Sequence, residues 1–155
     1  MKSVNPIVWE RITSVPPHKA RTWFFDLRED DHMGHHHKRL YRGKGAPRKI
    51  LSRNADTVVV EDDYGGGPPT LVTVRLSGDH SIAYVFERPF YHSESQMTFT
   101  PEHGGTRMRT EAKPGWKGFG KVVGFFMRKS FPNLVLKDLD AHALQMEEEW
   151  RANPW

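Results

Sequence analysis

The sequence contains no cysteine, which excludes disulfide bonds and thiolate chemistry. No apolar run approaches the ~20 residues that a membrane-spanning helix needs, and residues 1–15 lack the apolar core of a signal peptide. Internal repeats, low-complexity tracts and linkers are also lacking. We therefore expect one soluble, cytoplasmic domain that covers residues 1–155.

An excess of one charge is lacking too. The 23 lysines and arginines are interspersed with 19 aspartates and glutamates, for a net charge of +4. Because the sequence has no basic helix and no aromatic RNA-binding motif, we expect no nucleic-acid partner. Apolar residues make up only 37% of the chain, so the aromatic side chains must supply much of the core, at ~150–250 Å² buried each.

Short alternating runs of apolar and polar residues, separated by turn-forming residues, predict most of the secondary structure. The run 70–76 is typical: Val72, Val74 and Leu76 share one face. The expected strands cover residues 7–15, 48–53, 57–62, 70–76, 81–87, 92–100 and 107–113. Their spacing of about ten residues indicates an antiparallel meander.

Helical spacing appears near the start and at the end of the chain. Ala20, Trp23, Phe24 and Leu27 predict a helix over residues 18–28. A second short helix over residues 32–39 would follow the capping residues Asp30 and Asp31.

The final third predicts a long amphipathic helix over residues 117–150. It has two apolar stripes: Phe119, Val122, Val123, Phe126 and Met127, then Val135, Leu139, His142, Ala143, Met146 and Trp150. Proline lacks the amide hydrogen that a helix interior needs, so Pro132 should break the helix at residues 130–131. We expect the helix to restart within residues 133–140.

This order of elements, with the segments SVPPHKARTWFFDL and FMRKSFPNLVLKDLDAHALQMEEEW, resembles the START-like (SRPBCC, helix-grip) superfamily. That group includes polyketide cyclases, lipid-transfer domains, pollen-allergen-like proteins and coenzyme Q-binding proteins. The resemblance implies an α+β fold, in which a curved antiparallel sheet of about seven strands wraps around a long C-terminal helix and two short helices follow the first strand. It also implies a cavity for a hydrophobic or aromatic small molecule. Whether the chain is a monomer or a homodimer stays open.

Four residues are candidates for proton transfer in such a cavity. His142 lies on the apolar stripe that would line it, where an imidazole titrates near neutral pH. Tyr84, His92 and Glu94 lie on adjacent strands, and the unknown strand register decides which of them face inward. The alternatives are a buried structural histidine and a glutamate that pairs with an arginine on the solvent face.

Large apolar residues are the candidates for ligand contact. They are Trp23, Phe24, Phe86, Met97, Met108, Phe126 and Met127. Each would serve equally well in ordinary core packing, and the binding hypothesis requires that together they leave a void. Methionine is flexible enough to suit ligands of different shape.

The histidine-rich segment 30–37 is a candidate metal site. On a helix, His32 and His36 share one face, and two histidines with a carboxylate suit zinc or non-haem iron. The alternative is a solvated polar turn. We expect no cofactor, and a divalent metal is the alternative.

Three functions follow from these residues. The favoured hypothesis is a polyketide-cyclase-like enzyme that positions a flexible substrate and moves protons with histidine or glutamate. The second is a carrier of a lipid-like or aromatic molecule, without catalysis. The third is a metal-dependent lyase or hydrolase that uses the histidine cluster.

Overall fold

The chain forms a seven-stranded antiparallel sheet in the computed structural model, which describes residues 5–28, 48–63 and 67–155. The strands are β1 (Ile7–Thr13), β2 (Arg48–Arg53), β3 (Thr57–Asp62), β4 (Thr70–Ser77), β5 (Ser81–Arg88), β6 (Tyr91–Glu102) and β7 (Gly105–Trp116). Their order in the sheet is β1-β7-β6-β5-β4-β3-β2. The meander is therefore confirmed, and β1 is added at the far edge beside β7.

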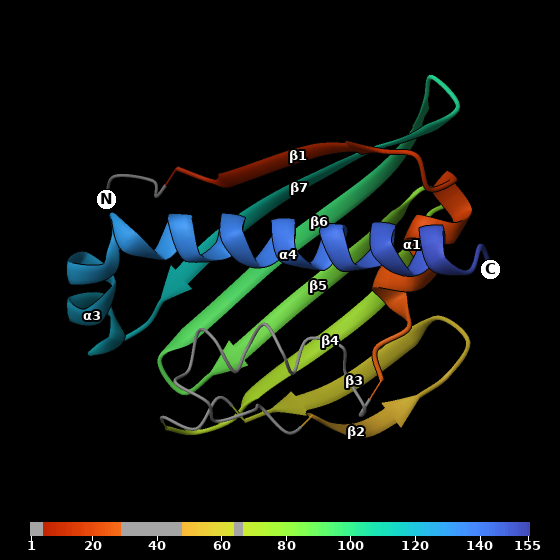
Figure 1. Cartoon of the computed structure of the whole chain (residues 1–155). Coiled ribbons are helices and arrows are strands. Elements are labelled where there is room, and N and C mark those ends of the chain that lie inside the picture. Colours follow the sequence, from red (N-terminus) through yellow and green to blue (C-terminus); the bar gives the residue numbers. More distant parts are fainter. Residues whose placement is uncertain (1–4, 29–47, 64–66) are drawn as a thin grey trace.

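Three helices complete the described structure: α1 (Pro17–Phe25), α3 (Gly120–Met127) and α4 (Ser130–Ala152). Figure 1 shows α4 running across one face of the sheet, with α1 near its C-terminal end and α3 beside its first turn. The short helix expected over residues 32–39 lies outside the described residues. No helix in the described ranges is long and apolar enough to cross a membrane.

The break in the C-terminal helix comes earlier than the sequence predicts. Residues 128 and 129 form a turn, and α4 begins at Ser130, so Pro132 lies in its first turn. The first amide groups of a helix have no intrahelical acceptor, so a proline there removes no hydrogen bond. Pro132 therefore lies just inside the start of α4 instead of interrupting the helix, and the restart expected within residues 133–140 is corrected to Ser130.

The core lies between the sheet and α1, with part of α4 closing it. The buried cluster comprises Trp9, Val15, Ala20, Trp23, Phe24, Val58, Val60, Val72, Val74, Ile82, Met97, Phe99, Met108, Ala143 and Met146. The strand members alternate along their strands, as expected for a sheet with one face covered. Phe24 of α1 contacts Phe99 of β6 at a ring-centroid distance of 6.0 Å, which places the solid core at the α1 end of the sheet.

Three acidic side chains of α4 hold that helix to β1 and α1. The hydrogen bonds run from Trp9 Nε1 to Asp140 (2.8 Å), from Arg11 Nε and Nη2 to Glu147 (3.0 and 2.9 Å) and from Trp23 Nε1 to Glu149 (2.8 Å). Hydrogen bonds to charged groups are stronger than neutral ones. They fix the position of α4 over the sheet without filling the space beneath its first half.

Candidate functional site

A cavity of about 310 Å³ lies between the sheet and the first half of α4. Its floor is set by the pairing of β6 with β7. Two cross-strand pairs, Ser95 with Ala112 and Ser93 with Pro114, carry small side chains on the inner face. Side chains opposite each other on one face of a sheet are neighbours, so two consecutive small pairs leave a hollow between sheet and helix.

Larger side chains limit the cavity at both ends of these strands. Toward α1, Met97 and Phe24 belong to the core and also line the cavity. Toward α3, three rings contact one another: Tyr91 and Trp116 at 4.8 Å, and Phe131 of α4 at 5.7 and 5.6 Å from those two. The hollow is thus a compartment limited by core at one end and by an aromatic cluster at the other.

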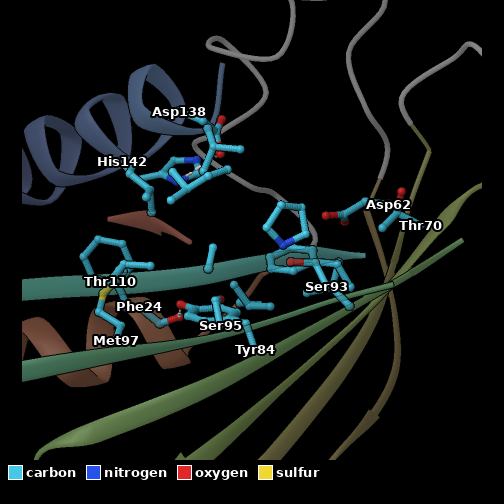
Figure 2. Close-up of a pocket in the computed structure, with 18 of the residues that line it drawn as sticks. Phe24, Asp62, Thr70, Tyr84, Ser93, Ser95, Met97, Thr110, Asp138 and His142 are labelled. Atoms are coloured by element: carbon cyan, nitrogen blue, oxygen red, sulfur yellow. Dashed lines mark hydrogen bonds and ion pairs between the residues drawn. The ribbon is translucent and has the colours of Figure 1, made fainter. Parts of the chain in front are cut away.

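The roof of the cavity is one face of α4. Val135, Leu139 and His142 line it at helical spacing, together with Asp138. His142 is only 8% exposed, and its Nδ1 lies 3.7 Å from Oδ2 of Asp138, four residues earlier. Figure 2 shows His142 and Asp138 on α4, across the cavity from the labelled residues of the sheet. This is the only described histidine that lines the cavity, and a carboxylate beside it would stabilise an imidazolium.

Two hydroxyl groups on the cavity walls, those of Thr110 and Tyr84, differ in their hydrogen bonding. The Thr110 hydroxyl is buried and has no hydrogen-bond partner among the described residues. A buried donor without a partner is costly, so a ligand oxygen next to Thr110 would be stabilised. The Tyr84 hydroxyl instead donates a 2.9 Å hydrogen bond to the carbonyl oxygen of Phe24, and burial raises the pKa of Tyr84. Tyr84 is therefore a neutral, engaged phenol at physiological pH.

A buried ion pair forms part of the wall on the β2–β3 side. Arg48 donates from Nε and Nη2 to the two carboxylate oxygens of Asp62, at 2.7 and 2.9 Å. Both side chains are almost fully buried, at 5% and 3% exposure. The two opposite charges compensate each other, so this pair adds polarity to the wall without adding net charge.

Six of the eleven predicted cavity residues lie where the sequence places them. They are Trp23, Phe24, Tyr84, Phe86, Met97 and His142. Their location is observed, whereas a role in binding or catalysis stays a prediction.

The other five do not line the cavity. Met108 is fully buried in the core, opposite Phe99. Phe126 and Met127 lie on α3, where Phe126 is 78% exposed. His92 and Glu94 contact each other at 3.1 Å at the surface, and the Glu94 side chain is 71% exposed.

The phase of β6 explains the error for His92 and Glu94. Inward residues of this strand carry odd numbers, from Ser93 through Met97, so both candidates fall on the opposite face. The inward phase could have been inferred from the two largest apolar residues, Met97 and Phe99. The same phase would have identified Ser93 and Ser95, which sequence reasoning missed.

Other cavity residues also escaped the sequence analysis. Thr110 and Ala112 alternate with charged residues on β7, and Asp138 stands one helical turn before His142. Helical spacing from His142 was a signal for Asp138. The Arg48–Asp62 pair carried no such signal, because its partners come together only through the pairing of β2 with β3.

The candidate metal ligands His32 and His36 lie outside the described residues. Within the ranges that the structure describes, no three histidine, aspartate or glutamate side chains are arranged to hold a metal ion.

Comparison with known proteins identifies the fold. No protein-family model matches the chain, and no curated protein matches it in sequence. Among solved structures, TTHA0849 from Thermus thermophilus is 16% identical with a TM-score of 0.67, over 95% of this chain and 97% of that one. CV1439 from Chromobacterium violaceum is 15% identical with a TM-score of 0.60, over 93% and 95% of the two chains. The di-domain ARO/CYC protein StfQ of the steffimycin biosynthetic pathway is 12% identical with a TM-score of 0.60, and the match covers 94% of this chain and 52% of StfQ.

At these identities the likeness concerns the backbone. It extends over at least 93% of this chain in all three structures. The chain has the START-like, helix-grip fold.

Proposed function

We propose that this protein binds a largely apolar small molecule with carbonyl or hydroxyl groups in the cavity beneath α4, and that His142 moves a proton on that molecule. The observation that carries the proposal is the buried imidazole of His142 on the cavity roof, with the Asp138 carboxylate beside it. A histidine held next to a carboxylate inside a mainly apolar compartment is a common arrangement for general acid–base chemistry.

The proposed chemistry is a cyclase-type ring closure. Neutral His142 takes a proton from a carbon between two carbonyl groups of the ligand. The resulting enolate then attacks the carbon of another carbonyl group, farther along the ligand, to form the ring bond. The imidazolium, stabilised by Asp138, then returns the proton to the new alkoxide. Thr110 is placed to donate a hydrogen bond to a ligand oxygen, and the enclosing walls hold the flexible chain in a reactive conformation.

The fold supports this assignment in general terms. StfQ and BexL are described as di-domain ARO/CYC proteins of biosynthetic pathways, and each matches this chain over about half of its length. The cavity walls contain both the aromatic side chains that would pack against a polyketide and the few polar groups that would orient it.

A non-catalytic carrier is the second candidate, and one observation favours it. Several polar groups on the described walls already have partners: Arg48 pairs with Asp62, and Tyr84 donates a hydrogen bond to the carbonyl of Phe24. Catalysis then depends on His142 almost alone. A carrier needs only the apolar compartment.

The test separates binding from catalysis. Mass spectrometry first identifies any small molecule that copurifies with the untagged protein. Thermal unfolding is then followed with aromatic polyketides and with fatty acids, where a ligand at a hundred times its dissociation constant adds about 2.7 kcal/mol. Turnover of the ligand that stabilises the protein is compared for wild type, His142→Gln and the matched control His80→Gln, which changes an exposed histidine.

Normal binding with lost turnover in His142→Gln, and normal turnover in His80→Gln, would support the cyclase proposal. Binding without turnover in the wild type would establish the carrier instead. Turnover that is unchanged in His142→Gln would refute the role of His142, and failure of both ligand classes to stabilise the protein would refute binding of either class.

A further inference from the structure

Helix α3 packs against the sheet through its glycines. Gly120 and Gly124, one turn apart, are its only buried residues. A Cβ at position 120 would lie 2.4 Å from the carbonyl oxygen of Phe90, and one at position 124 would lie 2.4 Å from Cδ1 of Trp116. The helix backbone therefore lies directly on these two residues, and no larger side chain fits between them.

The large apolar side chains of this segment face solvent as a result. An ordinary surface helix buries its apolar stripe and exposes its polar face, whereas α3 buries its two glycines and exposes its large apolar side chains. We call the exposed set the α3 patch: Phe119 (73% exposed), Val122 (48%), Val123 (41%), Phe125 (58%) and Phe126 (78%). Contiguous exposed apolar residues of this kind mark a docking surface for a protein or a membrane.

The segment that carries the α3 patch is rich in cations and has no acidic residue in its sequence. Residues 112–137 contain no aspartate or glutamate. The cations of that segment are Lys113, Lys117, Lys121, Arg128, Lys129 and Lys137. The guanidinium of Arg128 lies 4.5 Å from the ring centroid of Phe125, so charge and aromatic surface adjoin directly. The next twelve residues, 138–149, carry five acidic groups that include the contacts of α4 with β1 and α1.

We propose that the α3 patch binds the surface of an anionic lipid bilayer. Phenylalanine and valine would enter the boundary between headgroups and acyl chains, while lysine and arginine would remain at the phosphate level. Figure 1 shows α3 at one end of the molecule, beside the first turn of α4.

Charge complementarity favours a bilayer over a second copy of the chain. A twofold interface brings the same surface of both copies together. It would place the cations of one α3 patch against those of the other, and like charges in contact are unfavourable. An anionic bilayer offers apolar depth and negative charge in one surface, which matches both properties of the α3 patch.

The docking surface is connected to the cavity through one side chain. Trp116 contacts Gly124 of α3 and also lines the cavity, where its ring contacts Phe131 of α4. Docking through α3 would therefore hold the aromatic end of the cavity close to the bilayer. The bilayer proposal goes beyond the proposed function and does not depend on it, since binding to vesicles is measured without any cavity ligand.

The experiment measures binding of the full chain to vesicles by co-sedimentation. Neutral phosphatidylcholine vesicles are compared with vesicles that also contain phosphatidylglycerol. We expect at least tenfold stronger binding to the anionic vesicles, weakened by added salt, because each basic residue near the surface contributes roughly a fivefold gain. Binding that is absent, or equal for the two vesicle types, would overturn the proposal.

Three variants identify the surface. Phe125→Ser/Phe126→Ser removes two exposed rings without a change of charge. Lys121→Gln/Lys129→Gln removes two cations, and for this lysine variant we expect roughly 25-fold weaker binding to the anionic vesicles. Ile12→Ser is the matched control, because Ile12 is 58% exposed on β1, outside the α3 patch. All replaced side chains are exposed, and circular dichroism checks that each variant folds.

Loss of vesicle binding in both double variants, with wild-type binding in Ile12→Ser, would support the α3 patch as the lipid-binding surface. Unchanged binding in either double variant would overturn it. Light scattering of the free protein tests the competing partner. A wild-type dimer that dissociates in Phe125→Ser/Phe126→Ser, together with no vesicle binding, would show that a second copy covers the α3 patch and would also overturn the proposal.

Discussion

Replacing Ala112 with leucine tests whether the space beneath α4 is vacant. Ala112 faces the cavity from β7, opposite Ser95, whereas Ala143 lies on α4, fully buried in the core and away from the cavity lining. The same substitution at the two alanines therefore adds the same atoms to a hollow and to a packed region. Opposite signs of the stability change are expected.

The magnitudes follow from burial. At about 0.8 kcal/mol per buried methylene, the three added carbons of leucine contribute roughly 2.4 kcal/mol in the cavity. Ordering the leucine side chain costs roughly 0.5–1 kcal/mol. Ala112→Leu should thus stabilise the protein by about 1.5 kcal/mol, or raise its Tm by roughly 3–6 °C for a chain of this size. Ala143→Leu should destabilise it by roughly 1–3 kcal/mol, because a packed core must distort to accept extra volume.

Urea unfolding of the ligand-free wild type and both variants measures these changes, with a constant m value as the check that only stability has changed. Ala112→Leu should also weaken binding of any cavity ligand, since the leucine occupies part of the same space. If Ala112→Leu proved as destabilising as Ala143→Leu, the hollow would not exist, and the proposed function would lose its basis.

Three further predictions concern contacts around the cavity and α3. Tyr84→Phe should cost about 1 kcal/mol of stability at neutral pH through the lost hydrogen bond. Because folding raises the pKa of Tyr84, wild-type stability should fall more steeply than that of the variant as pH rises above about 10. Urea unfolding of both proteins at neutral pH and above pH ~10 measures the two effects. Asp62→Asn should cost about 3–5 kcal/mol, because it removes the charge of the buried carboxylate that pairs with the Arg48 guanidinium, and Arg48→Met/Asp62→Leu should recover most of that loss; equal losses in the two proteins would contradict this. Gly124→Ala should destabilise the protein although alanine favours helices by about 1 kcal/mol, because its Cβ would lie 2.4 Å from the Trp116 ring; a higher melting temperature would show that α3 shifts freely.

The strands were predictable because alternation and turn signals agree locally. The bounds of β2 and β3 coincide with the predicted ranges 48–53 and 57–62. The bounds of β6 and β7 do not coincide. Strand β6 extends one residue before and two after the predicted range 92–100, and β7 extends two before and three after the predicted range 107–113, so that the two strands pair up to Tyr91 and Trp116. Pairing over that length depends on the partner strand, which a local pattern does not contain.

The stripe over residues 119–127 misled for a different reason. Apolar residues at helical spacing usually mark the buried face of a helix, so Phe126 was expected near the cavity. The opposite face carries Gly120 and Gly124, and a glycine face permits closer approach to the Phe90 backbone and the Trp116 ring than any side chain would. Two glycines one helical turn apart were therefore the better indication of the packing face.

The cavity depends on side chains that are small where the fold would accept large ones. Along the inner faces of β6 and β7, the pairs begin with a large one (Phe99 with Met108) and a mixed one (Met97 with Thr110). Two small pairs follow, and then a large one again (Tyr91 with Trp116). A sequence selected for stability alone would fill the middle, since each buried methylene adds about 0.8 kcal/mol. Retaining Ser93, Ser95, Ala112 and Pro114 at these positions gives up that gain, and such losses are typical of functional sites. The hollow beneath His142 is thus encoded by small residues in register on two strands, and only knowledge of the register reveals it.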